Sequence, residues 1–233
     1  MIGNLKEVSK FENTGFPEDE GQFLQSVMPL KDEFILPGRF AFNKDAHFTE
    51  KSSLLLKKDL LFDEWCNKWD MSKEVLLEKS PPNIIRTRFL QEVFPNSMFI
   101  TIIRHPIANS YAVKKWTNDF FLDKLIKHWV IAHTIYFNDR KYLKNEILIS
   151  YEDLIENPDF VLEKISKFIG YNIISSETLS DKNKFYFDLW EGKYFKSLKH
   201  FFKELEKKYL IHKYEKTINK FGYSFFDLHK KFS

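Results

Sequence analysis

Two positively charged residues follow apolar runs of the sequence, and their positions indicate anion chemistry. Lys79 comes directly after residues 74–78 (EVLLE), and Arg104 comes directly after residues 98–103 (MFITII). Both runs have strand character, and Pro106 favours the start of a helix just beyond Arg104. A guanidinium between the end of a strand and the start of a helix can bind a phosphate together with backbone N–H groups. Arg104 is therefore a candidate anion-binding residue, unless it pairs with a carboxylate or caps another helix.

The elements that must position these residues alternate along the chain. The pattern predicts strands at 74–78, 98–103 and 146–150, and helices at 83–94, from 106 onward and within 120–143. Residues 158–169 form a further predicted helix, with Asn157 as its N-cap and Gly170 as its C-cap. Such alternation is typical of an α/β fold with a parallel sheet flanked by helices. Ligands of such sheets bind at the carboxyl ends of the strands.

The two ends of the chain have a different character from the middle. Residues 1–57 are rich in Gly and Pro and leave room for one short helix, near 20–27. Residues 185–233 are predicted to be helical, most clearly over 198–221. No repeat, low-complexity tract or linker divides the sequence, so we expect a single domain over residues 1–233.

The composition excludes several classes of protein. Hydrophobic residues make up 43% of the 233 residues, which argues against intrinsic disorder. A net charge of +3 gives no large field for nucleic acid or an acidic membrane, so any basic site must be local. The single cysteine, Cys66, cannot form an internal disulfide. No apolar run is long enough to span a bilayer, and no secretory signal is evident, so a cytoplasmic location is expected. There is no H-E-x-x-H string, and no metal site is predicted.

Two longer strings resemble the sulfotransferase family, whose members transfer a sulfuryl group from 3'-phosphoadenosine 5'-phosphosulfate (PAPS). They are EKSPPNIIRTRFLQEVFPNSMFITIIRHPIANSYAVKKW, which begins at Glu78, and ISYEDLIENPDFVLEKISKFIGY, which begins at Ile149. FENTGFPEDEGQFLQSVMP and GRFAFNKDAHFTE are similar to a bacterial branch of the family, and FGYSF in the tail matches more weakly. The resemblance implies a P-loop-like α/β fold and PAPS as the co-substrate.

The resemblance also implies residues that hold the nucleotide. Arg104 matches the arginine for the 3'-phosphate. The serine of that site usually lies eight residues later, where this chain has Ala112, and Ser110 lies two residues earlier. Two helical steps turn a side chain by about 200°, so Ser110 is expected to point elsewhere unless the turn is distorted. Lys114 and Lys115 could supply replacement charge or form a solvated basic face.

Further residues are implied for the reaction itself. Lys79 matches a lysine that stabilises charge on the sulfuryl group and the leaving phosphate, although a surface ion pair with Glu78 is an alternative. Glu18 and Glu20 are the candidates for the base that deprotonates the acceptor, with Glu12 and His47 also possible. Arg86 and Arg88 lie two residues apart on one helix and face different ways, so at most one lines an anion pocket. Arg86, nearer the strand end, is the better candidate.

One family feature is not found in the sequence. Sulfotransferases normally open with a strand, a phosphate-binding loop of the form PRSGTT or PKSGTT, and a helix, but no RSGTT or G-x-x-x-x-G-K-[ST] string occurs here. We therefore expect an incomplete sulfotransferase-like domain without that first unit. The predicted function is sulfuryl transfer from PAPS to a hydroxyl or amine of a small molecule or glycan. The alternative is a non-catalytic or truncated remnant with a residual nucleotide or anion pocket.

Overall fold

The parallel strands are arranged as two pairs in the computed structural model, which describes residues 1–28, 32–117, 121–174, 179–194 and 198–232. Strand β1 (Val8–Lys10) pairs with β2 (Val75–Leu77), and β3 (Phe99–Ile103) pairs with β4 (Glu146–Ser150). Both pairs are parallel, with Ile100 opposite Ile147 in the second. The three predicted strands are thus confirmed, and the chain is a mixed α/β protein.

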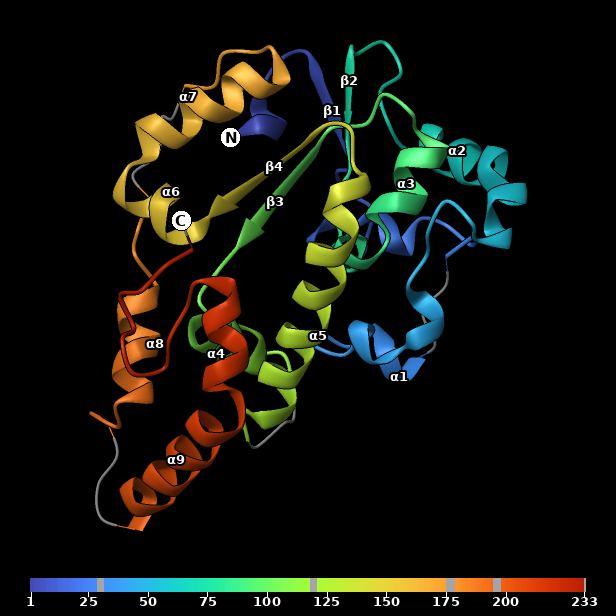
Figure 1. Cartoon of the computed structure of the whole chain (residues 1–233). Coiled ribbons are helices and arrows are strands. Elements are labelled where there is room, and N and C mark those ends of the chain that lie inside the picture. Colours follow the sequence, from blue (N-terminus) through green and yellow to red (C-terminus); the bar gives the residue numbers. More distant parts are fainter. Residues whose placement is uncertain (29–31, 118–120, 175–178, 195–197, 233) are drawn as a thin grey trace.

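Helices surround the two strand pairs (Figure 1). In chain order the α-helices of the described residues are α1 (Asp32–Ile35), α2 (Lys58–Cys66), α3 (Thr87–Val93), α4 (Pro106–Lys114), α5 (Asp123–Asp139), α6 (Tyr151–Glu156), α7 (Pro158–Ile169), α8 (Asn183–Trp190) and α9 (Leu198–Ile218). Short 3₁₀ segments connect them; those at Gly21–Phe23, Lys44–Ala46 and Pro81–Ile85 bear on the site. None of the helices that the structure describes is both long and apolar enough to cross a bilayer.

The largest buried cluster lies beyond the carboxyl end of β3. Trp129 and Tyr136 of α5 pack there with Ile107 of α4, Trp190 of α8 and Leu210 of α9. The aromatic residues bury the most surface per side chain and so dominate this packing. This cluster fixes α4, α8 and α9 around the residue that follows β3, which is Arg104.

Smaller clusters cover the other faces. Ile165 of α7 packs with Ile149 and Ile147 of β4, whereas Trp65 of α2 packs with Phe89 of α3 and Leu76 of β2. The buried residues Val161, Leu162 and Ile165 of α7 recur at helical spacing, which is why the sequence predicts this helix. Its C-cap, Gly170, has φ of +79°, as predicted.

The structure differs from the predicted elements at both ends of the chain: residues 222–232, which are predicted to be helical, contain no helix. The expected helix at 20–27 is absent, and residues Gly21–Phe23 form a single 3₁₀ turn. The predicted helix at 83–94 is shortened to α3, because the segment Pro81–Ile85 is 3₁₀. This 3₁₀ segment begins with two consecutive prolines, Pro81 and Pro82. The side chain of Asn157 makes no capping hydrogen bond to α7, although the helix does begin at Pro158.

Candidate functional site

Lys79 and Glu20 form an ion pair just beyond the carboxyl end of β2. Lys79 Nζ lies 3.4 Å from Glu20 Oε1. The Lys79 side chain is 58% exposed, whereas that of Glu20 is 11% exposed. The second carboxylate oxygen of Glu20 accepts a hydrogen bond from the side-chain amide of Gln22. The pair therefore presents a solvent-accessible ammonium backed by a buried carboxylate.

Glu78 points inward instead of pairing with Lys79. Successive side chains of an extended chain point to opposite sides, so Glu78 and Lys79 separate. The Glu78 carboxylate accepts hydrogen bonds from Gly21 N at 3.1 Å, from Ser80 Oγ and from Asn83 Nδ2. Burial raises the pKa of Glu78, and these three donors oppose that shift. The alternative of a surface pair between Lys79 and Glu78 is wrong.

Gly21 is needed for this arrangement. A Cβ at this position would lie 2.7 Å from Glu78 Oε1 and 2.7 Å from the Phe11 ring. Only glycine lets the backbone approach Glu78 closely enough to donate its N–H. Its carbonyl accepts a hydrogen bond from Trp65 Nε1 at 3.0 Å, which ties the segment that carries Glu20 to α2.

Arg86 is a completely buried guanidinium next to this cluster. None of its three side-chain nitrogens has a hydrogen-bond partner in the part of the chain that the structure describes. Its guanidinium carbon lies 5.3 Å from the centre of the Phe48 ring. Burial lowers the pKa of Arg86 to about 10, and the negative charge of Glu78 opposes that shift. Arg86 therefore stays protonated at neutral pH, and its nitrogens retain unused capacity to donate hydrogen bonds.

The Arg88 guanidinium, unlike that of Arg86, donates hydrogen bonds to two carboxylates. It donates from Nε to Glu50 Oε2 at 2.8 Å and from Nη1 to Asp139 Oδ1 at 3.2 Å. Asp139 Oδ2 lies 2.7 Å from His47 Nε2. The two arginines contact different groups, as predicted, but Arg86 is the N-cap residue before α3 and only Arg88 lies within the helix. Arg88, Asp139 and His47 form a structural network.

Arg104 follows β3, where the sequence predicts it. Its Nε donates to Asn183 Oδ1 of α8 at 2.8 Å, and its guanidinium carbon lies 4.2 Å from the centre of the Tyr151 ring. Nη2 is buried without a hydrogen-bond partner among the described residues. Arg104 is therefore held by an amide and an aromatic face, not by a carboxylate, and keeps donor capacity for an anion.

Glu152 organises the surroundings of Arg104. It accepts hydrogen bonds from His105 N at 2.9 Å, from Asn183 Nδ2 at 2.8 Å and from Tyr223 OH at 3.0 Å. The network fixes the orientation of the Asn183 amide, so that its oxygen faces Arg104. Glu152 and Asn183 were not singled out from the sequence, because both lie far from Arg104 along the chain.

Lys115 and Ser110 occupy different environments beside Arg104. Lys115 Nζ lies 5.0 Å from the centre of the Tyr186 ring, and the Arg104 guanidinium lies 5.4 Å from the same ring. Ser110 is 1% exposed, and its Oγ has no hydrogen-bond partner in the described residues. The same ring thus brings Lys115 and Arg104 together, while Ser110 faces the interior of the protein.

Glu18 makes no hydrogen bond or ion pair with these side chains in the described structure. It is exposed in the 3₁₀ turn Pro17–Asp19, with a φ of +55°. Glu12 pairs with Lys10 at 3.1 Å. Of the carboxylates considered as the base, only Glu20 contacts Lys79 in the described structure.

The predicted residues therefore form two groups. Glu20, Lys79 and Arg86 surround the end of β2, and Arg104 and Lys115 surround the end of β3. No hydrogen bond or ion pair joins the two groups within the described ranges. The structure also describes no cluster of three or more His, Cys, Asp or Glu side chains that could hold a metal ion.

The structure is a mixed α/β fold with cationic residues beyond the ends of its parallel strands. The sequence also matches a protein-family model. The sulfotransferase family model matches residues 14–175, which is more than half of the chain. The chain belongs to the sulfotransferase family. The matched range contains every predicted site residue except Glu12, which precedes it. Family membership supports sulfuryl transfer as the general chemistry.

One solved structure similar to this chain is a sulfotransferase domain from the curacin biosynthetic pathway. The two are 19% identical in sequence, with a TM-score of 0.40. The similarity covers 54% of this chain and 47% of the other, so it spans about half of that domain's length. No curated protein matches the sequence.

Proposed function

We propose that this protein transfers a sulfuryl group from PAPS to a hydroxyl or amine of a small molecule or glycan. The observation that carries the proposal is the Lys79–Glu20 pair, in which a cation and a carboxylate lie together at the carboxyl end of a strand. The ammonium can stabilise the negative charge of the leaving group, and the carboxylate can accept the proton of the acceptor. We also assign the reaction to the cytoplasm, which cell fractionation would test.

The residues present suit an anionic donor. Arg104 retains a buried nitrogen that lacks a partner in the described residues, and Lys115 lies on the same ring as Arg104. We assign Arg104 and Lys115 to the 3'-phosphate, because guanidinium groups bind phosphate oxygens through directed hydrogen bonds. Arg86, with three unused nitrogens, is assigned to an oxygen of the phosphosulfate end, a contact that requires the groups covering it to move, because its side chain is also completely buried. Ser110 is included as a contact only if α4 turns, because its hydroxyl is buried.

Sulfuryl transfer forms one bond to sulfur and breaks another. The acceptor oxygen or nitrogen bonds to sulfur as the bridging bond between sulfur and the phosphate oxygen breaks. The electron pair of that bond goes to the departing 3',5'-bisphosphate, and the proton of the acceptor goes to a base. Lys79 meets the negative charge that grows on the departing oxygen, and electrostatic stabilisation of this kind lowers the barrier.

Glu20 is the base in this proposal, in preference to Glu18. Its carboxylate is held by Lys79 and by Gln22. When donor oxygens attract the Lys79 ammonium, the ion pair loosens, and Glu20 Oε1 becomes available to accept the proton of the acceptor. Donor binding and base activation are thereby coupled through one side chain.

The experiment is sulfate transfer from labelled PAPS to a panel of sugar, polyol and amine acceptors. Labelled product whose formation requires the protein supports the proposal. Measurable binding of the bisphosphate product without transfer to any acceptor would contradict it and support the second candidate, a binding protein without turnover. The lack of an RSGTT-like string in the sequence is the observation that favours this second candidate.

A further inference from the structure

Helix α9 has an apolar stripe on the side opposite its buried side. Leu198, Phe201, Phe202, Leu205 and Tyr209 are all between 48% and 68% exposed. At 3.6 residues per turn they fall within an arc of about 100°. The residues that α9 buries, Lys203, Leu210, Tyr214 and Ile218, lie on the other side of the helix. We call the five exposed residues the α9 stripe.

The α9 stripe cannot turn inward, because the other side of the helix is fixed. Glu206 accepts a hydrogen bond from Leu122 N at 2.8 Å, and Lys213 Nζ lies 2.7 Å from Asp123 Oδ1. Both contacts bind α9 to the start of α5. Figure 1 shows the first turns of α9 projecting from the body of the molecule. A contiguous apolar surface held outward in this way marks an interaction surface.

Basic residues accompany the stripe. Lys199 and Lys208 are exposed on this part of α9, whereas Lys203 is buried and pairs with Glu206 at 2.7 Å. Trp116, which follows α4, is also exposed, at 72%. Aromatic side chains combined with lysines are typical of helices that lie in the headgroup region of anionic membranes.

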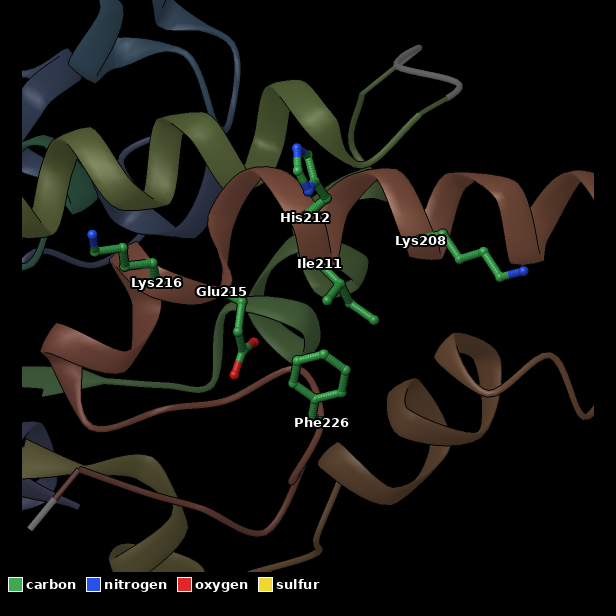
Figure 2. A pocket seen from close by; sticks show the side chains of 6 residues that line it. All are labelled: Lys208, Ile211, His212, Glu215, Lys216 and Phe226. Atoms are coloured by element: carbon green, nitrogen blue, oxygen red, sulfur yellow. The ribbon is translucent and has the colours of Figure 1, made fainter.

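A surface hollow lies along the second half of α9 and is lined by residues of that helix and by Phe226. Figure 2 shows Ile211, Glu215 and Phe226 pointing toward one another, while Lys208, His212 and Lys216 point outward. The Glu215 carboxylate already accepts hydrogen bonds from Ser224 Oγ at 2.6 Å and Phe225 N at 2.7 Å. The outward-pointing basic groups of the hollow therefore face solvent beside an exposed phenyl ring.

We propose that the α9 stripe docks this protein on the surface of an anionic lipid bilayer. The helix lies in the plane of the interface, with Phe201 and Phe202 among the acyl chains and the neighbouring lysines at the headgroups. A second copy of the chain fits less well as the occupant. The apolar spacing ends at Tyr209 and is followed by His212 and Lys216 on the same face, which is too short for a coiled-coil seam.

The test uses the full chain and two kinds of vesicle, phosphatidylcholine alone and phosphatidylcholine mixed with phosphatidylserine. We expect flotation with the anionic vesicles and a decrease in binding as salt rises. The variant F201S/F202S should lower this binding about tenfold or more, because two buried phenyl groups are lost. F160S is the matched control, since Phe160 of α7 is 69% exposed and lies outside the stripe.

Circular dichroism and thermal midpoints establish that both variants keep the fold. Failure of the wild-type chain to bind anionic vesicles would overturn the proposal. Concentration-dependent dimerisation that F201S/F202S abolishes, without vesicle binding, would also overturn it and identify a second copy as the occupant. Equal loss of binding with F160S would show that the stripe is not the contact surface.

Discussion

Arg104 and Asn183 are 79 residues apart in the sequence and are joined by a 2.8 Å hydrogen bond from Nε to Oδ1. Asn183 in turn donates to Glu152, which also receives the backbone N–H of His105. The direction of the Arg104 guanidinium is thus set by two consecutive hydrogen bonds, between Glu152 of α6 and Asn183 of α8 and between Asn183 and Arg104. An arginine with a fixed direction loses less entropy when it binds an anion than a freely rotating one.

The first prediction concerns nucleotide affinity. Arg104→Gln should weaken binding of 3'-phosphoadenosine 5'-phosphate about tenfold or more, because a charge-assisted hydrogen bond to phosphate is lost. Isothermal titration calorimetry measures the change. Lys167→Gln removes an exposed cation on α7 and serves as the control. Unchanged affinity in the Arg104 variant would remove this residue from the nucleotide site.

The second prediction separates the two candidate bases. Glu20→Gln should lower kcat for transfer about a hundredfold, because a general base contributes roughly that factor. Lys79→Met should cause a similar loss by removing the charge that faces the leaving group. Glu18→Gln should leave the rate near that of the control Glu163→Gln, since Glu18 is exposed and Lys79 pairs with Glu20 instead. A loss of rate in Glu18→Gln with normal turnover in Glu20→Gln would reverse the assignment.

The third prediction is that stability falls in weak acid because of buried histidines. Burial lowers the pKa of His105 to about 4, that of His128 to about 3 and that of His133 to about 4, from an ordinary value of 6.5. His105 shows the chemical reason, since Nδ1 accepts from Ile107 N and Nε2 donates to Ser224 O, as a neutral ring requires.

The sign of this effect follows from proton uptake. Below about pH 6.5 the unfolded chain binds protons that the folded chain does not, so stability falls as the pH falls toward 4. Each histidine contributes about 1.4 kcal/mol per pH unit across that window. His128→Phe, which fits between the rings of Phe40 and Phe42, should reduce the slope by that amount in urea unfolding at several pH values. An unaltered slope would contradict the assignment.

The fourth prediction concerns the structural network around Arg88. Arg88→Met leaves the buried carboxylate of Asp139 with His47 alone and should cost about 2–3 kcal/mol of unfolding free energy. Lys167→Met breaks the exposed pair with Glu163 and should have no measurable effect. Chemical denaturation compares the two. Equal stability of the variants would show that the Arg88 network contributes little.

Local patterns predicted the central elements well. Strand β4 and the end of α7 match the predicted bounds, because β-branched residues and a C-cap glycine act through near neighbours. Strand β1 was not predicted, since three residues of sequence VSK carry no strand signal of their own. Its pairing with β2, 67 residues away at Val8 and Val75, provides the stabilisation. The extent of the domain, 1–233, remains a prediction.

The candidate site was only partly accessible to sequence reasoning. The positions of Lys79 and Arg104 follow from strand ends, which a local pattern reveals. The partners of these residues do not, because Glu20 is 59 residues from Lys79 and Asn183 belongs to another helix. Arg86 likewise packs against Phe48, which belongs to a distant segment of the chain. No periodic pattern in the sequence links these two residues.

Lys79 and Arg104 follow strands that belong to two separate ladders, β1–β2 and β3–β4. Within the described residues, no ladder of backbone hydrogen bonds joins the two strand pairs. They are coupled by side-chain packing and by the segments that connect them. A single molecule that spanned both strand ends would act as a crosslink between the two halves. Its binding would raise the melting temperature and slow amide hydrogen exchange in both ladders at once, even though it touches only their tips.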